Sequence, residues 1–310
     1  MSGPVTSVDA PPEQRAPDPP APPCAEVFDD REATVGSITV RRALPRRGRR
    51  TVGAWCFADH MGPQAVGDNG GLDIGPHPHI GLHTVTWLVD GALLHLDSLG
   101  SEQEIRPGQL NLMTAGHGVV HAEEMVRTYR GDLQGVQLWV AQPESTRDGA
   151  AAFEHHADLP QADLGNGAAT VLVGSLAGAT SPARHDTDLV GAELSLGGGG
   201  AVVPVRADFE HALIVIDGEV AVGETVVRPG QLGYVGMGRD ELPLASGSGG
   251  ARLLLLGGVP FPEPIVMWWN FVGRTKEEMA QARTQWATGD EARFGEVDTA
   301  LARIPAPPAL

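Results

Sequence analysis

One peptide occurs twice in the chain, and this repeat is the feature that most limits its fold. The sequence RPGQL stands at residues 106–110 and again at residues 228–232. An apolar run that ends in Asp-Gly precedes each copy, at residues 87–91 and 215–218. Asp-Gly favours a hairpin turn, and Pro-Gly marks another turn. Two successive copies of one β-unit predict two similar β-domains in tandem.

The remaining sequence also indicates short strands. Apolar runs in which Val, Thr and Leu alternate with polar residues lie between turns, for example at residues 82–89 and 134–140. This alternation is typical of antiparallel strands. The chain contains 41 glycines and 25 prolines, which favours many short strands over long helices. We therefore predict an all-β fold.

The ends of the chain and one helix complete this outline. Residues 1–30 are rich in proline and poor in apolar side chains, so we expect a disordered tail. Residues 305–310 predict a second loose end. A helix is expected at residues 275–288, because a capping box begins at Thr275 and Gly289 can close the last turn.

Charge and cysteine content exclude several classes of protein. The 22 basic and 39 acidic residues give a net charge of −17, which argues against nucleic-acid or anionic-membrane binding. Six arginines between residues 41 and 50 could follow phosphates, but Pro45 and Gly48 favour an exposed hairpin. Cys24 and Cys56 imply no disulfide framework. No apolar run is long enough to cross a membrane, so we expect a soluble, cytoplasmic protein.

Two clusters of potential ligands predict a metal site. His77 and His79 stand at positions i and i+2, as do His121 and Glu123. Side chains at i and i+2 leave the same face of a strand, so each pair would point into one space. Three imidazoles and one carboxylate would hold one divalent metal, with Fe(II) favoured over Ni, Mn, Zn, Co or Cu. The second copy of the repeat lacks these ligands, since His211 is its one nearby histidine.

Four segments of the chain resemble the pirin family of the cupin superfamily. Residues 77–86 (HPHIGLHTVT) and 107–123 (PGQLNLMTAGHGVVHAE) carry the strongest likeness. Residues 49–63 and 263–271 extend it, so that it covers nearly everything from about residue 35 to residue 297. The resemblance implies a bicupin, which is a tandem of two antiparallel jelly-roll β-barrels, here with a short C-terminal helix.

The same resemblance implies how the parts divide. An N-terminal metal-binding cupin would cover residues 31–145. A C-terminal cupin without metal ligands, followed by the helix, would cover residues 146–304. The ligands of the family, which usually hold iron, correspond by position to His77, His79, His121 and Glu123.

The chain departs from the usual pirin pattern at two positions. His83 stands where pirins commonly have Glu, and His117 where they commonly have Arg. If one strand continued past His79, His83 would share its inward face and could be an additional ligand or a partner of a ligand. His117 would alter the charge near the pocket mouth. Further candidates for ligand partners are Asp59, His60 and Asp97, and candidates for apolar walls of a cavity or core are Phe57 and Met113.

Pirins include members that open flavonols such as quercetin with O2. The resemblance therefore implies a quercetin 2,3-dioxygenase-like oxidoreductase that acts on a flavonol or related enol. Glu123 is the candidate for the catalytic base, because its carboxylate would lie beside the open coordination site and could loosen from the metal. One alternative is a non-catalytic, redox-sensitive iron protein that binds a transcription factor or a metabolic enzyme. Another is a metal that only stabilises the barrel. Open coordination positions beside a carboxylate favour the enzyme.

Overall fold

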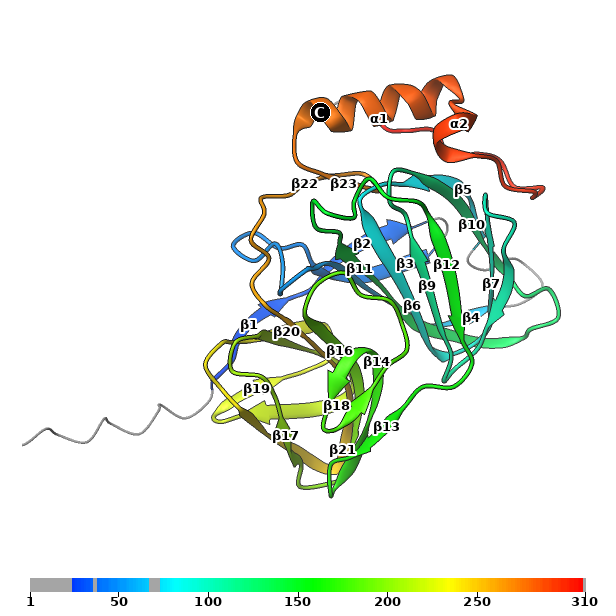
Figure 1. Cartoon of the computed structure of the whole chain (residues 1–310). Coiled ribbons are helices and arrows are strands. Elements are labelled where there is room, and N and C mark those ends of the chain that lie inside the picture. The colour runs from blue at the N-terminus through cyan, green and yellow to red at the C-terminus, as the bar shows by residue number, and fades with distance from the viewer. Residues whose placement is uncertain (1–23, 36–37, 67–72, 309–310) are drawn as a thin grey trace, which may run out of the picture.

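Strands make up more than half of the described residues. The structure is a computed structural model that describes residues 24–35, 38–66 and 73–308, and Figure 1 shows two β-rich halves with two helices at one end. The predicted β-rich tandem with a short C-terminal helix is confirmed. Most of the tail expected at residues 1–30 lies outside the described residues.

The N-terminal half contains two antiparallel sheets. A seven-stranded sheet has the order β12-β9-β6-β11-β4-β3-β2, and a four-stranded sheet has the order β5-β10-β7-β8. The first comprises β2 (Arg31–Val35), β3 (Ile38–Leu44), β4 (Trp55–Val66), β6 (Leu82–Asp90), β9 (Leu110–Thr114), β11 (Gly131–Ala141) and β12 (Ala152–His156). The second comprises β5 (Ile74–His79), β7 (Leu93–Asp97), β8 (Glu102–Ile105) and β10 (Val119–Met125).

The C-terminal half is built on one ten-stranded sheet. Its main path is β1-β20-β18-β21-β16-β14-β13, and three short strands pair beside this path. The strands are β1 (Glu26–Asp29), β13 (Gln161–Asp163), β14 (Gly167–Leu176), β15 (Ala179–Thr180), β16 (Leu189–Leu196), β17 (Ala201–Pro204), β18 (Glu210–Val222), β19 (Thr225–Val227), β20 (Gln231–Gly236) and β21 (Glu241–Gly258).

The two copies of the repeated peptide form the same turn. In the first, the side-chain oxygen of Gln109 accepts a hydrogen bond from the backbone N–H of Arg106 at 3.0 Å. In the second, Gln231 and Arg228 make the same bond at 3.0 Å. Gly108 and Gly230 have φ values of 87° and 85°, which a residue with a side chain rarely adopts. The repeat in the sequence is therefore also a repeat in structure.

A hairpin and two helices follow the second half. The hairpin consists of β22 (Val266–Trp268) and β23 (Phe271–Gly273), and the helices are α1 (Lys276–Thr288) and α2 (Glu291–Phe294). Thr275 caps α1 by accepting a hydrogen bond from the N–H of Glu278, and Gly289 ends it in the left-handed conformation. In Figure 1 the helices lie next to the end of the N-terminal half that carries β5 and β10. None of the helices in the described ranges is long and apolar enough to cross a membrane.

Two strands connect the halves across the predicted division. Residues 26–29 were expected in the disordered tail, but they form β1 and pair with β20 of the C-terminal half. The strand β12 follows residue 145, yet it pairs with β9 of the N-terminal half. The boundary between residues 145 and 146 stays a prediction.

At the C-terminus, the carbonyl of Pro307 accepts a hydrogen bond from Arg283, so this part of the expected loose end contacts α1.

The two halves also share one hydrophobic core. Trp55 of β4 is fully buried, and its indole N–H donates to the carbonyls of Val190 (3.1 Å) and Gly257 (3.2 Å) in the other half. A Cβ atom at Gly191 would lie 2.7 Å from the ring of Trp55, so this position accommodates only glycine without rearrangement. The halves are therefore closely packed against each other.

The arginine-rich segment contains the expected hairpin turn, because Arg46 and Arg49 pair across the exposed residues Arg47 and Gly48. The same segment also contributes to the contacts between the halves. Arg49 lies 3.5 Å from the carboxylate of Glu210, and its guanidinium stacks over the ring of Tyr234. Arg42 forms an ion pair with Asp59 within the first half. Cys24 and Cys56 are both free, as predicted.

Candidate metal centre

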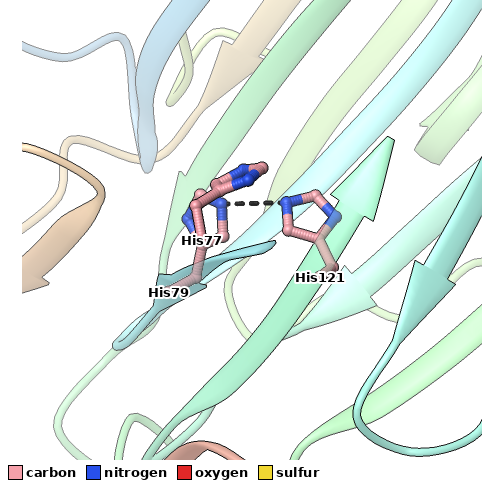
Figure 2. A group of neighbouring side chains, drawn as sticks. All are labelled: His77, His79 and His121. Carbon is pink, nitrogen blue, oxygen red and sulfur yellow. Dashed lines mark hydrogen bonds between the residues drawn. The ribbon is translucent and has the colours of Figure 1, made fainter. Parts of the chain in front are cut away.

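Adjacent antiparallel strands bring three histidines together. β5 carries His77 and His79, and β10 carries His121, which lies opposite His77 in the register. The three side chains are buried, and each offers a ring nitrogen within 4.8 Å of the others. The Nε2 atoms of His79 and His121 are 3.1 Å apart (Figure 2). Two nitrogens that bind one ion at about 2.0–2.1 Å are themselves about 3 Å apart, so this spacing fits a shared cation.

The protonation state of these histidines also suits a cation. Nδ1 of His77 lies 2.9 Å from the carbonyl oxygen of Gly75 and can donate a hydrogen bond to it, which leaves Nε2 with a lone pair. Burial lowers the pKa of His77 to about 4. Burial and the nearby His77 lower the pKa values of His79 and His121 well below the ordinary value. The three imidazoles are therefore neutral at pH 7 and able to act as ligands.

The predicted fourth ligand lies apart from this group. Glu123 lines the same cavity, and burial raises its pKa to about 7. Its carboxylate does not belong to the group of ligand atoms within 4.8 Å. The pairing of β10 with β5 shifts register between His121 and Glu123, and such a bulge changes the direction of side chains. Coordination by Glu123 stays a prediction.

The histidines open onto a cavity of about 540 Å³. One wall is aromatic, because Phe57 and Trp139 stack with their ring centroids 4.0 Å apart. The hairpin β22–β23 covers another side through Trp268 and Trp269. The cavity is large enough for a planar molecule of two or three rings, since small-molecule sites usually have volumes of about 300–1,000 Å³.

Charged side chains also line the cavity. Arg42 donates two hydrogen bonds to Asp59, at 2.7 and 2.6 Å, and its guanidinium lies over the ring of Phe57. Burial raises the pKa of Asp59, although the hydrogen bond from Arg42 opposes this effect. Arg31 is exposed at the cavity and makes no ion pair within the described part of the chain. Its positive charge acts on Asp59, where it favours the ionised carboxylate and lowers the pKa.

Several predicted pocket residues lie elsewhere. His83 contacts Thr114 and, at 3.1 Å, Asp186, and it does not line the cavity. The expectation that it shares a face with His79 was wrong, because β5 ends at His79 and the chain turns at Gly81, whose φ is 68°. His83 therefore belongs to β6, in a different sheet.

The other candidates divide in two groups. Phe57 and Asp59 line the cavity. His60 accepts a hydrogen bond from Arg41 (3.0 Å) behind this wall, and burial lowers its pKa to about 4. Outside the cavity, Met113 is buried in an apolar cluster, and the side chain of His117 is 57% exposed near Asp148.

One residue near the three histidines was not recognised in the sequence. His95 of β7 has its Nδ1 atom 3.4 Å from Nδ1 of His121, and its Nε2 atom 3.1 Å from the carboxylate of Asp97. The spacing of His95 and Asp97 at i and i+2 repeats the pattern of the two ligand clusters. That spacing could have identified the pair.

Known proteins share both the sequence and the fold. Residues 37–140 match the profile "Pirin", and residues 192–295 match the profile "Pirin C-terminal cupin domain". A Pseudomonas aeruginosa protein, provisionally named a quercetin 2,3-dioxygenase, is 48% identical over 275 residues, which cover 88% of this chain and 86% of that protein.

Solved structures agree with this result. The crystal structure of quercetin 2,3-dioxygenase from Acinetobacter baumannii has 42% sequence identity and a TM-score of 0.88, and the match covers 92% of this chain and 95% of that chain. The pirin YhhW from Escherichia coli, crystallised with nickel(II), is 15% identical with a TM-score of 0.61, over 76% of this chain and 99% of that chain. At this identity the likeness to YhhW concerns the fold alone.

Proposed function

Because this chain belongs to the pirin family, we propose that it is a metal-dependent dioxygenase that opens a quercetin-type flavonol, or a related enol, with O2. One observation carries the proposal. Three buried, neutral imidazoles converge at a cavity whose walls are aromatic and whose volume of about 540 Å³ suits a flavonol. The similarity to proteins named as quercetin 2,3-dioxygenases supports the same substrate class.

The proposed ligands are His77, His79 and His121, with Glu123 as the fourth. Fe(II) is the metal that we favour for an N3O set, and Ni, Mn, Zn, Co and Cu are the alternatives. A divalent metal held here would supply Lewis-acid chemistry that lowers the pKa of a substrate hydroxyl. The nickel complex of YhhW shows that this fold can be crystallised with such an ion.

The side chains around the cavity would bind and orient the substrate. The stacked rings of Phe57 and Trp139 would form an apolar wall beside a planar aromatic molecule. Arg31 would attract a phenolate or another anionic group at the cavity edge. Glu123 is buried in the same cavity and would accept the proton of the substrate hydroxyl as the general base.

The test combines metal analysis with turnover. Bound metal is measured by elemental analysis, and the protein is then reconstituted with Fe, Ni or Mn. We expect the flavonol absorbance to fall together with O2 uptake in the wild-type protein, but not in a His79→Ala variant. Bound metal without any O2 consumption would contradict the proposal and favour the non-catalytic role as a redox-sensitive protein partner.

A further inference from the structure

A line of buried polar contacts leads away from the histidine cluster. β7 pairs with β10 so that Asp97 lies opposite His121. Nδ1 of His121 is 3.4 Å from Nδ1 of His95, and Nε2 of His95 is 3.1 Å from Oδ2 of Asp97. The other carboxylate oxygen of Asp97 accepts hydrogen bonds from the backbone N–H groups of Leu99 (2.9 Å) and Ser101 (3.0 Å). The contacts thus end on a carboxylate that acts only as an acceptor.

Only one arrangement of protons satisfies all these contacts when His121 is a ligand. Nε2 of His121 must then carry a lone pair, so the ring proton is on Nδ1 and can be donated to His95. His95 accepts at Nδ1, and its own proton is therefore on Nε2, where it is donated to Asp97. Each donor in the series points toward the carboxylate.

The middle residue of the series is held in place by packing. The ring of His95 stacks on Phe153 of β12, with centroids 4.4 Å apart and an angle of 13° between the planes. Both His95 and Asp97 are buried, so bulk water has little access to either contact. The orientation of His95 is thus fixed independently of its hydrogen bonds.

We propose that Asp97 and His95 are positioning residues that fix the tautomer of His121 and make its Nε2 atom a stronger metal ligand. This inference rests on the metal site of the proposed function. Hydrogen bonds from a ligand imidazole to a carboxylate orient the ring and raise its basicity, and removal of such partners typically costs about 10- to 100-fold in metal affinity. Here a second imidazole transmits the effect of the carboxylate.

The test measures the metal affinity of the apoprotein by competition with a chelator, and the absorption spectrum of its Co(II) form. Asp97→Asn should weaken binding about 10- to 100-fold and shift the Co(II) spectrum. The matched control is Asp186→Asn. Asp186 also lies 3.1 Å from a buried imidazole, that of His83, but this pair does not contact the ligands. Asp186→Asn should therefore bind metal as the wild type does.

A second variant tests whether His95 and Asp97 act as one unit. His95→Phe keeps a ring that can stack on Phe153 but removes both hydrogen bonds. It should weaken binding as much as Asp97→Asn, and the double variant should be no weaker, because the two changes interrupt the same series. If Asp97→Asn does not fold, His95→Phe alone decides the question.

The outcomes separate this inference from the proposed function. If the wild-type chain binds no metal, the proposed function fails, and the inference fails with it. If the wild type binds metal and the Asp97→Asn or His95→Phe apoprotein binds it equally well, with an unchanged Co(II) spectrum, only the inference is overturned. Additive losses in the double variant would overturn it as well.

Discussion

Glu123 is the proposed ligand whose position and protonation differ most from those of the three histidines. It is buried beside three imidazoles, yet its oxygen atoms do not join their group. As the fourth proposed ligand, this carboxylate could loosen from the metal and accept a proton from a substrate in the cavity. Its role as a base can therefore be tested separately from metal binding.

We expect Glu123→Gln to retain most of the bound metal and to lower flavonol turnover by about 10²- to 10⁴-fold, because glutamine keeps the size but cannot accept the proton. Metal content and O2 uptake are measured on the same sample. Glu124→Gln is the control, since Glu124 is the neighbouring residue and forms an ion pair with Arg127 outside the cavity. Unchanged turnover in Glu123→Gln would exclude this residue as the base.

His211 is a buried histidine of the C-terminal half and should make stability depend on pH. It is 2% exposed, its Nε2 atom has no hydrogen-bond partner among the described residues, and burial lowers its pKa to about 4. Between pH 4 and 6.5 the unfolded state binds more protons at this site than the folded state. The free energy of unfolding must therefore fall as the pH decreases through this range.

We predict that His211→Leu removes this contribution. Relative to the variant, the wild type should lose up to about 3 kcal/mol of stability between pH 7 and pH 4, since one pKa unit corresponds to about 1.4 kcal/mol. Urea denaturation at several pH values measures the difference. His185→Leu, at an exposed position, controls for the loss of one imidazole. Parallel pH profiles of the wild type and His211→Leu would refute the prediction.

At the level of elements, α1 shows how a few residues of local sequence determine where a helix begins. Thr275 accepts the hydrogen bond of the N–H of Glu278, and the side chain of Glu278 accepts one from the N–H of Arg274. The buried residues Met279, Ala282 and Trp286 face the hairpin side of the molecule. The cap is thus the main local feature that starts the helix.

We expect Thr275→Ala to lower the free energy of unfolding by about 1 kcal/mol, because an unsatisfied N–H group remains at the start of α1. Thr284→Ala is the control within the same helix. Thr284 is exposed, and among the described residues its hydroxyl bonds only to the carbonyl of Ala280, so alanine should be neutral or slightly stabilising there. Equal effects of the two substitutions on thermal unfolding would show that the cap contributes nothing specific.

The elements also show how far the sequence predicts the site. Alternation at i and i+2 was enough to identify His77, His79 and His121, because each pair lies within one strand. It failed for His83, since the end of β5 depends on a turn at Gly81 that the apolar pattern does not reveal. His95 was missed because its contact with His121 depends on the pairing of β7 with β10. Which strands pair depends on how their side chains pack against the rest of the molecule, and the sequence of a single strand does not reveal this.

In the whole molecule, the two halves depend on each other for their cores. The cluster around Trp55 includes Leu138 from the N-terminal half and Leu254 and Leu256 from the C-terminal half. Strand β1 adds a second connection, because the residues just before β2 complete the sheet of the other half. The RPGQL repeat predicted two similar units. It did not predict that β1 would join the sheet of the C-terminal half, since a four-residue strand has too short a pattern to identify its partner.

The contribution of β1 can be measured by comparing a chain that begins at Cys24 with one that begins at Asp30. All four residues of β1 pair with β20, while Val27 and Phe28 pack against the apolar clusters on either side. Loss of these two partly buried side chains should lower the free energy of unfolding by about 2–4 kcal/mol. The exposed edge of β20 should also promote aggregation. Metal content should not change, since β1 does not line the cavity.

Equal melting temperatures of the two chains would show that the strand is dispensable, whereas a parallel loss of metal would show that the C-terminal sheet supports the histidine cluster.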